Sequence, residues 1–269
     1  MTGSTWGRLA VATALVAVTL FAGVALLGPS AASPVLIGSG PTRSLSVEPS
    51  AWVVSVGMWG ALLLSACSVA AGWWALRRDW QPDPRRTVAW GLGGAAVMAL
   101  VPPLGSSDVL SYAVYGRMVA TGLNPYTTTA ADLVAARDPV GLAYAGAWGD
   151  VSSVYGPVAS AWQGAISALT GTSVVWFVVV LQLGGLALFA ATGLLLLKRG
   201  ALDLAGRRRV AWLWFANPLL WYLLVNSAHL DGLAVLLGTA GLVVAARSPV
   251  ASGVLAALAV CTKVSYVLY

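Results

Sequence analysis

Long apolar runs separated by short polar segments dominate the pattern of this chain. Residues 9–27 contain no charged side chain, and residues 50–76 contain none either. A helix needs about 20 apolar residues to cross the roughly 30 Å hydrocarbon layer of a bilayer. The pattern therefore predicts an all-α, polytopic bundle of about seven transmembrane helices. The expected spans are residues 9–28, 51–76, 87–104, 173–197, 210–227, 232–246 and 250–268.

The spans divide the chain into three regions: residues 1–104, 105–172 and 173–269. The middle region has no spanning run but is rich in Tyr and Trp, which favour membrane interfaces. One or two helices on the membrane surface are expected there. The first span is expected to be a retained helix, because its apolar stretch exceeds the 7–15 residues usual in a secretory signal core. The chain stops at the end of an apolar run, so it is expected to be the N-terminal part of a longer protein.

Composition supports a membrane location. Hydrophobic residues make up 59 % of the chain and charged residues only 9 %, whereas soluble domains carry about 25 % charged residues. The net charge of +6 is concentrated in residues 77–86 and 198–209, both between apolar runs. The positive-inside rule places such clusters in the cytoplasm. The charge therefore does not indicate a nucleic-acid partner, and residues 105–172 are predicted to lie outside a plasma membrane, among membrane lipids.

A first candidate for chemistry is Asp108, which follows the third predicted span. Tyr112 and Tyr115 come four and seven residues later, so in a helix they share its face, whereas Arg117 points nearly the opposite way. A carboxylate beside two phenols suits acid–base chemistry. The alternative is that Asp108 simply caps the helix, since Asp favours that position.

Two turn motifs follow within the middle region. The sequence Gly-Leu-Asn-Pro-Tyr contains Asn124 and Tyr126, and Tyr155 opens a Tyr-Gly-Pro motif. Glycine and proline at these spacings indicate turns.

Further polar residues lie in the last region. Pro218 is predicted to kink or open its span, which ends near His229 and Asp231. His229 is the only histidine, and both cysteines lie in apolar runs, so the sequence predicts neither a metal site nor a cofactor. Lys263 would lie ~20 Å along its predicted helix. At that depth it could snorkel to the interface or bind an anion such as a lipid phosphate near Asp108.

The order of these motifs resembles a known family. Asp-Val-Leu-Ser-Tyr at 108–112 is followed by Tyr-Gly-Arg at 115–117, Gly-Leu-Asn-Pro-Tyr at 122–126 and Tyr-Gly-Pro at 155–157. Asn-Pro at 217–218 and Ala-His-Leu-Asp at 228–231 come next. From about residue 102 onward, the chain resembles the polyprenyl-phosphate-mannose-dependent α-(1→6)-mannosyltransferases of actinobacteria, within the GT-C superfamily. The family's His-Asn-Asp motif has Leu230 in its middle position here.

The resemblance implies an inverting membrane glycosyltransferase with its active site on the extracytoplasmic side. Mannose would move from a polyprenyl-phosphate-mannose donor to a lipid-anchored mannan acceptor of the lipomannan type. Asp108 matches the catalytic carboxylate and would act as general base. The residues expected to bind substrate are Tyr112, Tyr115, Arg117, Asn124, Tyr126, Tyr155, His229, Asp231 and Lys263.

Two other functions remain compatible with the sequence. A transporter or flippase of a lipid-linked sugar would be expected to show inverted repeats and broken helices in matching halves, and only one span is predicted to break. A non-catalytic scaffold of the cell envelope would not need Asp108 and Lys263 on the same side of the membrane.

Overall fold

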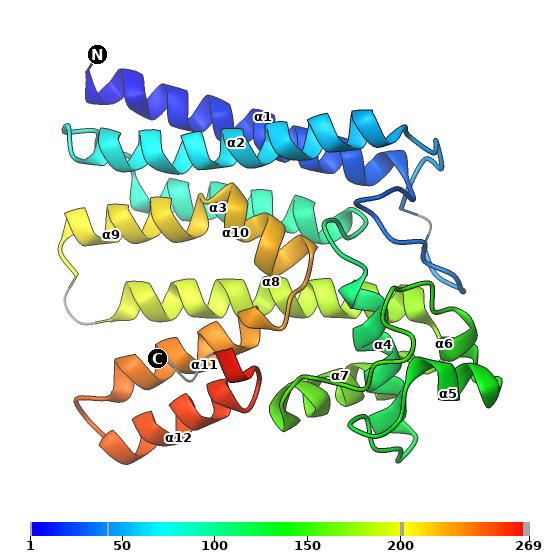
Figure 1. The fold of residues 1–269 in the computed structure, drawn as a ribbon. Coiled ribbons are helices and arrows are strands. Elements are labelled where there is room, and N and C mark those ends of the chain that lie inside the picture. The colour runs from blue at the N-terminus through cyan, green and yellow to red at the C-terminus, as the bar shows by residue number, and fades with distance from the viewer. Residues whose placement is uncertain (1, 42, 200–201, 266–269) are drawn as a thin grey trace.

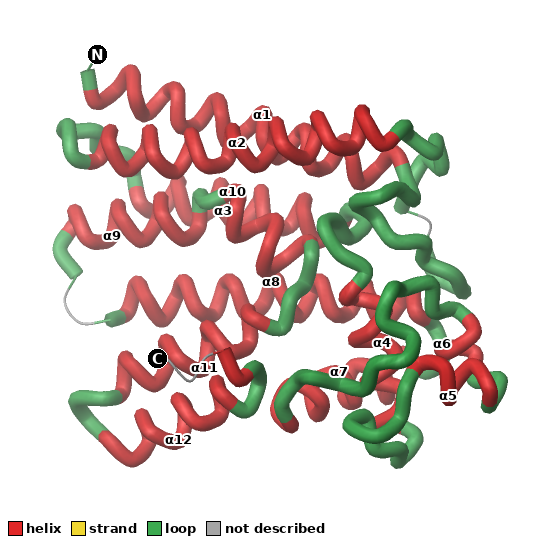
Figure 2. Tube along the Cα trace, viewed as in Figure 1, coloured by secondary structure: helices red, strands yellow, loops and turns green. Residues whose placement is uncertain are grey.

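The structure is a computed structural model that describes residues 2–41, 43–199 and 202–265. Within these residues every regular element is a helix, and the only extended pairing is an isolated bridge between Ser30 and Ser33 (Figure 2). The predicted all-α class is confirmed.

Three described helices are long and apolar enough to cross a membrane: α1 (Gly3–Leu27), α2 (Ala51–Leu76) and α8 (Val174–Lys198). A fourth span is possible if the segments Pro218–Asn226 and Asp231–Val244 count as one, although they are bent by 112°. The structure is that of a helical membrane protein with three or four spans by length and composition, where about seven were expected.

The other predicted spans are helical but shorter. α3 (Pro84–Leu100) has 17 residues, α11 (Asp231–Val244) has 14 and α12 (Pro249–Val260) has 12. α3 ends just before Pro102 and Pro103, which cannot continue a helix without losing hydrogen bonds. Apolar length along the sequence therefore overestimates the continuous helix, because proline and polar breaks divide it.

The predicted break at Asn217 and Pro218 is confirmed. The break divides a row of four consecutive helices, which we call the broken rod. It consists of α9 (Leu204–Val210), the π-helix η1 (Ala211–Phe215), α10 (Pro218–Leu220) and the π-helix η2 (Trp221–Asn226). The Asn217 side chain bridges the break, since Nδ2 donates to the Leu213 carbonyl and Oδ1 accepts from the Leu219 N–H. The side chain thus supplies hydrogen bonds to backbone groups on both sides of the break.

The helices lie in layers (Figure 1). α1 and α2 form an antiparallel hairpin over α3 and the broken rod, with α8 below them and the α11–α12 hairpin beside α8. Both arginine-rich connections lie at the end of the bundle that carries the start of α1, and residues 105–172 lie at the opposite end. The sequence analysis expected the arginine-rich segments and residues 105–172 on opposite sides of a membrane, and this arrangement is compatible with that expectation.

Residues 105–172 form a packed unit of four helices, where one or two were expected: α4 (Asp108–Ala120), α5 (Ala130–Ala135), α6 (Pro139–Leu142) and α7 (Pro157–Thr170). α4 packs on α7, and a Cβ on Gly116 would come within 2.5 Å of the Gln163 carbonyl oxygen. Buried apolar side chains of α4, α5 and α7 pack together with the start of α8. The unit is thereby held on the bundle and presents the first turn of α4 to it.

The layout predicts the accessibility of each end of the bundle. In a background with Cys67 and Cys261 replaced by Ala, Asn124→Cys is expected to react with a membrane-impermeant thiol reagent in intact cells. Arg207→Cys is expected to react only after the membrane is permeabilised. The reverse pattern would place the α4–α7 unit in the cytoplasm and rule out an extracytoplasmic site.

Candidate active site

A buried asparagine joins two helix ends near the centre of the molecule. The Asn226 side chain is 0 % exposed. Its Nδ2 donates to the carbonyls of Met98 at 3.0 Å and Pro102 at 2.9 Å, and its Oδ1 accepts from the Leu104 N–H at 2.9 Å. An unpaired backbone group buried away from water costs about 1–3 kcal/mol. Asn226 therefore satisfies the end of α3 and attaches it to the end of η2.

Two neighbouring side chains complete this network. Gln182 of α8, also fully buried, donates from Nε2 to the carbonyls of Asn226 at 2.8 Å and Val101 at 3.2 Å. The Ser227 hydroxyl donates to the Leu104 carbonyl at 2.7 Å. Residues 101–104 and 226–227 are thus held together from three sides.

The two segments that leave this network bring Asp108 and His229 together. His229 Nδ1 lies 3.8 Å from Asp108 Oδ2 and 3.3 Å from the Tyr112 hydroxyl. Asp108 and Tyr112 lie on the same face of α4, whereas His229 lies 117 residues after Tyr112 in the sequence. Their meeting is a tertiary effect of the shared anchor.

Asp108 is not used as a side-chain cap. α4 starts at Asp108, and its N-cap residue Ser107 makes no side-chain capping hydrogen bond. The Asp108 N–H donates instead to Ser106 Oγ at 3.0 Å. Its carboxylate side chain is 30 % exposed and lies at the N-terminal end of α4. The carboxylate is therefore available to accept a proton.

Tyr112 and Tyr155 contact each other beside Asp108 and His229. The Tyr155 hydroxyl donates to the Tyr112 hydroxyl at 3.4 Å, and the two rings meet edge to face with centroids 5.3 Å apart. Burial raises the pKa of both phenols, and it raises the pKa of Tyr115 to about 12. The phenols therefore stay protonated near neutral pH and can donate hydrogen bonds to a sugar or phosphate oxygen.

Lys263 forms an ion pair with Asp231. Its Nζ lies 3.1 Å from both carboxylate oxygens, and the side chains are 37 % and 29 % exposed. α12 ends at Val260, so Lys263 lies in the turn after the helix and the depth expected for a continuous helix does not apply. The charges of Asp108, Asp231 and Lys263 all act on His229 and on Tyr155. We refer to Asp108, Tyr112, Tyr155, His229, Asp231 and Lys263 as the Asp108 cluster.

The Tyr-Gly-Pro turn explains how Lys263 reaches this position. Gly156 N–H donates to the Thr262 carbonyl at 3.1 Å, and Val158 N–H donates to the Cys261 carbonyl at 3.0 Å. A Cβ on Gly156 would come within 2.0 Å of that Cys261 oxygen. The motif is thus a docking point for the end of α12, and only glycine permits the close approach.

Four of the predicted site residues bond outside this cluster. Arg117 Nε pairs with Asp138 Oδ2 at 2.8 Å, and the Tyr115 hydroxyl donates to the Val151 carbonyl at 3.0 Å. Asn124 Oδ1 accepts from the Tyr126 N–H at 3.0 Å within its own turn. The Tyr126 hydroxyl lies 3.1 Å from Ser160 Oγ of α7. These contacts stabilise the α4–α7 unit.

Gln182, Asn226 and Ser227 are the residues that the sequence interpretation missed. Each is a polar side chain within or at the end of an apolar run, and polar residues at such depth are costly unless they are paired. That signal could have identified Gln182 and Asn226, but not their partners. Among the described residues, no group of three His, Cys, Asp or Glu side chains is placed to hold a metal ion.

These features define a helical membrane protein with a polar, charged cluster where the α4–α7 unit meets the bundle. The family model described as the N-terminal domain of alpha-(1->6)-mannopyranosyltransferase matches residues 6–269. The chain belongs to this family, which comprises the A and B types of the enzyme. The resemblance seen in the sequence motifs is thereby confirmed.

Individual relatives agree with the family match. Alpha-(1->6)-mannopyranosyltransferase A of Corynebacterium glutamicum is 29 % identical over 212 residues, which is 76 % of this chain and 42 % of the relative. The B protein of the same organism is 30 % identical over 57 % of this chain and 25 % of its own length. A probable alpha-(1->6)-mannopyranosyltransferase of Mycolicibacterium smegmatis is 31 % identical over 54 % of this chain and 26 % of its own length. The chain thus spans less than half the length of these relatives, and no solved structure matches it.

The anchor predicts a large effect from one uncharged residue. Asn226→Leu keeps a similar volume but leaves three backbone groups without their partner, at about 1–3 kcal/mol each. We expect a clear fall in thermal stability, measured on the purified protein in detergent.

Asn124→Leu is the matched control for this substitution. Asn124 is exposed and its side chain bonds only within its own turn, so a much smaller change is expected. Equal stability of both variants would contradict the anchoring role of Asn226.

Proposed function

We propose that the protein is an inverting membrane mannosyltransferase in which Asp108 is the general base. The donor would be a polyprenyl-phosphate mannose, and the acceptor would be the growing mannan of a lipid-anchored, lipomannan-type glycolipid. The reaction would occur on the extracytoplasmic side. The observation that carries the proposal is the Asp108 carboxylate, which lies 3.8 Å from His229 Nδ1 in a cluster that also contains Tyr112 and the Lys263–Asp231 pair.

The chemistry requires few groups. A mannosyl phosphate already contains a good leaving group, so an enzyme must remove a proton from the acceptor hydroxyl and stabilise the departing phosphate. A carboxylate within hydrogen-bond reach of the hydroxyl can do the first, and a nearby cation can do the second. In the Asp108 cluster, Asp108 would be the carboxylate that takes the proton, and Lys263 would be the cation, with Asp231 as its present partner. With a β-linked donor and an α-linked product, one direct displacement inverts the anomeric carbon.

The relatives support the choice of sugar and linkage. Two of the three relatives are named alpha-(1->6)-mannopyranosyltransferase, and the third is named a probable one. Because the chain spans 42 % or less of each of them, we propose the activity for the complete protein. The polar cluster described above would supply its base and its phosphate-binding cation.

The role of the base predicts the effect of Asp108→Asn. The amide has nearly the shape of the carboxylate but cannot accept the proton, so mannose transfer should fall by at least the 10²–10⁴-fold that general base catalysis contributes. The measurement is transfer of labelled mannose in membranes containing the complete protein, normalised to the amount of protein.

Asp150→Asn is the control for this measurement. Asp150 is an exposed carboxylate in the same α4–α7 unit. The Asp150→Asn variant should therefore transfer mannose at the normal rate. Near-normal transfer by Asp108→Asn would exclude Asp108 as the base.

Lys263 is predicted to bind the donor phosphate. Lys263→Met keeps most of the apolar stem but removes the charge. A hydrogen bond to a charged group contributes roughly 1.5–3 kcal/mol, so the donor concentration for half-maximal transfer should rise about ten- to a hundredfold. Transfer rates measured over a range of donor concentrations test this.

Asp231→Asn separates phosphate binding from a purely structural ion pair. This variant also breaks the pair with Lys263 but keeps the ammonium. It should therefore weaken donor use less than Lys263→Met does. If both variants weaken donor use equally, the Lys263–Asp231 ion pair is structural and Lys263 does not bind the donor phosphate.

A further inference from the structure

Arg43 is a half-buried cation in the connection between α1 and α2. Its Nη1 donates to Gln182 Oε1 at 2.7 Å and to the Val101 carbonyl at 3.3 Å, with the Ala99 carbonyl at 3.5 Å. All three acceptors are formally neutral. Its Nη2 is buried and has no hydrogen-bond partner among the described residues.

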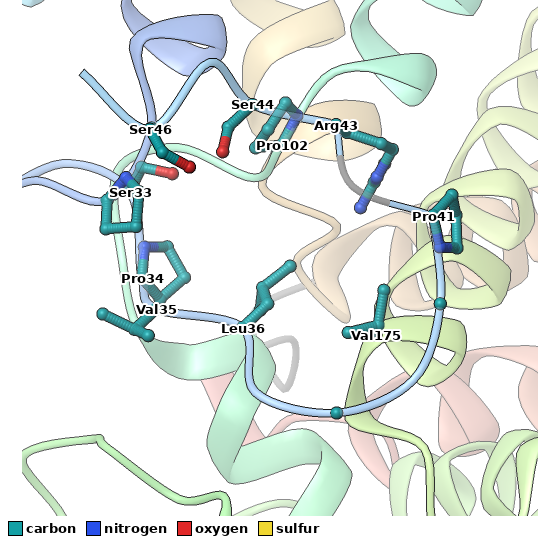
Figure 3. Close-up of a pocket in the computed structure, with 14 residues that line it drawn as sticks. Ser33, Pro34, Val35, Leu36, Pro41, Arg43, Ser44, Ser46, Pro102 and Val175 are labelled. Carbon is teal, nitrogen blue, oxygen red and sulfur yellow. The ribbon is translucent and has the colours of Figure 1, made fainter. Parts of the chain in front are cut away.

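The guanidinium points into a cavity of about 180 Å³ (Figure 3). One side of this cavity carries apolar side chains such as Leu36 and Val175, and Ser33, Ser44 and Ser46 contribute hydroxyls to its lining. The described lining contains no acidic residue, and Arg43 forms no ion pair with any described carboxylate. We call this cavity the Arg43 pocket.

The charge of Arg43 needs an explanation. Burial lowers the pKa of Arg43, but a guanidinium stays protonated in proteins because its pKa is so high. A buried charge is costly unless it is paired. The carbonyls of Ala99 and Val101 at the end of α3 offer partial negative charge, which accounts for Nη1. They leave the second nitrogen and most of the positive charge without compensation.

We propose that the Arg43 pocket binds a phosphate group. A guanidinium offers a planar fork of donors that matches the oxygens of phosphate, and serine hydroxyls can donate to the remaining oxygens. The pocket is lined by residues of the α1–α2 connection, and this connection lies at the end of the bundle that carries the α4–α7 unit (Figure 1). The phosphate could come from an anionic phospholipid or from solution. The pocket shares no residue with the Asp108 cluster, so the proposal does not depend on the proposed reaction.

Thermal unfolding in a neutral detergent tests the site with free phosphate. Phosphate is compared with chloride at equal ionic strength, and phosphate is expected to raise the midpoint of the wild type by mass action. Arg43→Gln should abolish the rise. Ser44→Ala leaves every described hydrogen bond of Arg43 intact and should raise the phosphate concentration needed for half the effect several-fold. Arg137→Gln, an exposed arginine of the α4–α7 unit, should respond like the wild type.

A second measurement tests the lipid source. The same proteins are placed in nanodiscs of mixed phosphatidylglycerol and phosphatidylcholine, and lipids that stay bound are identified by native mass spectrometry. Retention of phosphatidylglycerol that is lost in Arg43→Gln would assign the pocket to a lipid headgroup, whereas a phosphate effect without lipid retention would assign it to the free ion.

The proposal fails if the wild type responds to neither ligand, or if Arg43→Gln responds as strongly as the wild type. Arg43 would then only bind the end of α3. If Arg43→Gln cannot be purified as a folded protein, Ser44→Ala is the deciding variant. If phosphate shifts its unfolding midpoint just as it does in the wild type, the Arg43 pocket is excluded as the phosphate site.

Discussion

The hydrogen bonds of Asn226 and Gln182 are the constraint on which the rest of the structure depends. Within a bilayer, backbone groups at a helix end have no water to bond, so a broken helix survives only where other protein groups satisfy its ends. Here α3 ends before two prolines and η2 ends before a bend of 112°. Asn226 and Gln182 supply the missing partners for both ends at once. The two breaks are therefore stable only together.

This shared anchor explains why the polar cluster forms where it does. Asp108 lies four positions after Leu104, and His229 lies three positions after Asn226. With Leu104 and Asn226 bonded to each other, the short segments that follow cannot diverge far. The Tyr-Gly-Pro turn then adds the third component by docking residues 261 and 262. Three apolar parts of the chain, each unremarkable alone, thus deliver a carboxylate, an imidazole and an ammonium to one place.

The sequence predicted this site where chemistry and local spacing were sufficient. Asp108 and Tyr112 lie on one helical face as their spacing required, and the break at Pro218 followed from the missing backbone N–H. Long-range pairing was not predictable in the same way. Arg117 was expected to bind substrate, and the sequence did not indicate that it pairs with Asp138, 21 residues away. Asn226 looked like the end of an apolar run, because no local pattern shows that it bonds to residues more than 120 positions earlier.

The choice of the phosphate-binding cation follows from what each cation would leave behind. Arg117 and Asp138 have side chains only 22 % and 14 % exposed. Moving Arg117 to a substrate would leave a mostly buried carboxylate unpaired, which costs about 3–5 kcal/mol in comparable cases. The side chains of Lys263 and Asp231 are 37 % and 29 % exposed, so water can solvate the aspartate and the pair contributes less. Under the proposed function, exchanging the carboxylate partner for a phosphate would therefore cost Lys263 less than it would cost Arg117. A cation that binds a donor and releases its phosphate in every cycle needs such an exchangeable partner.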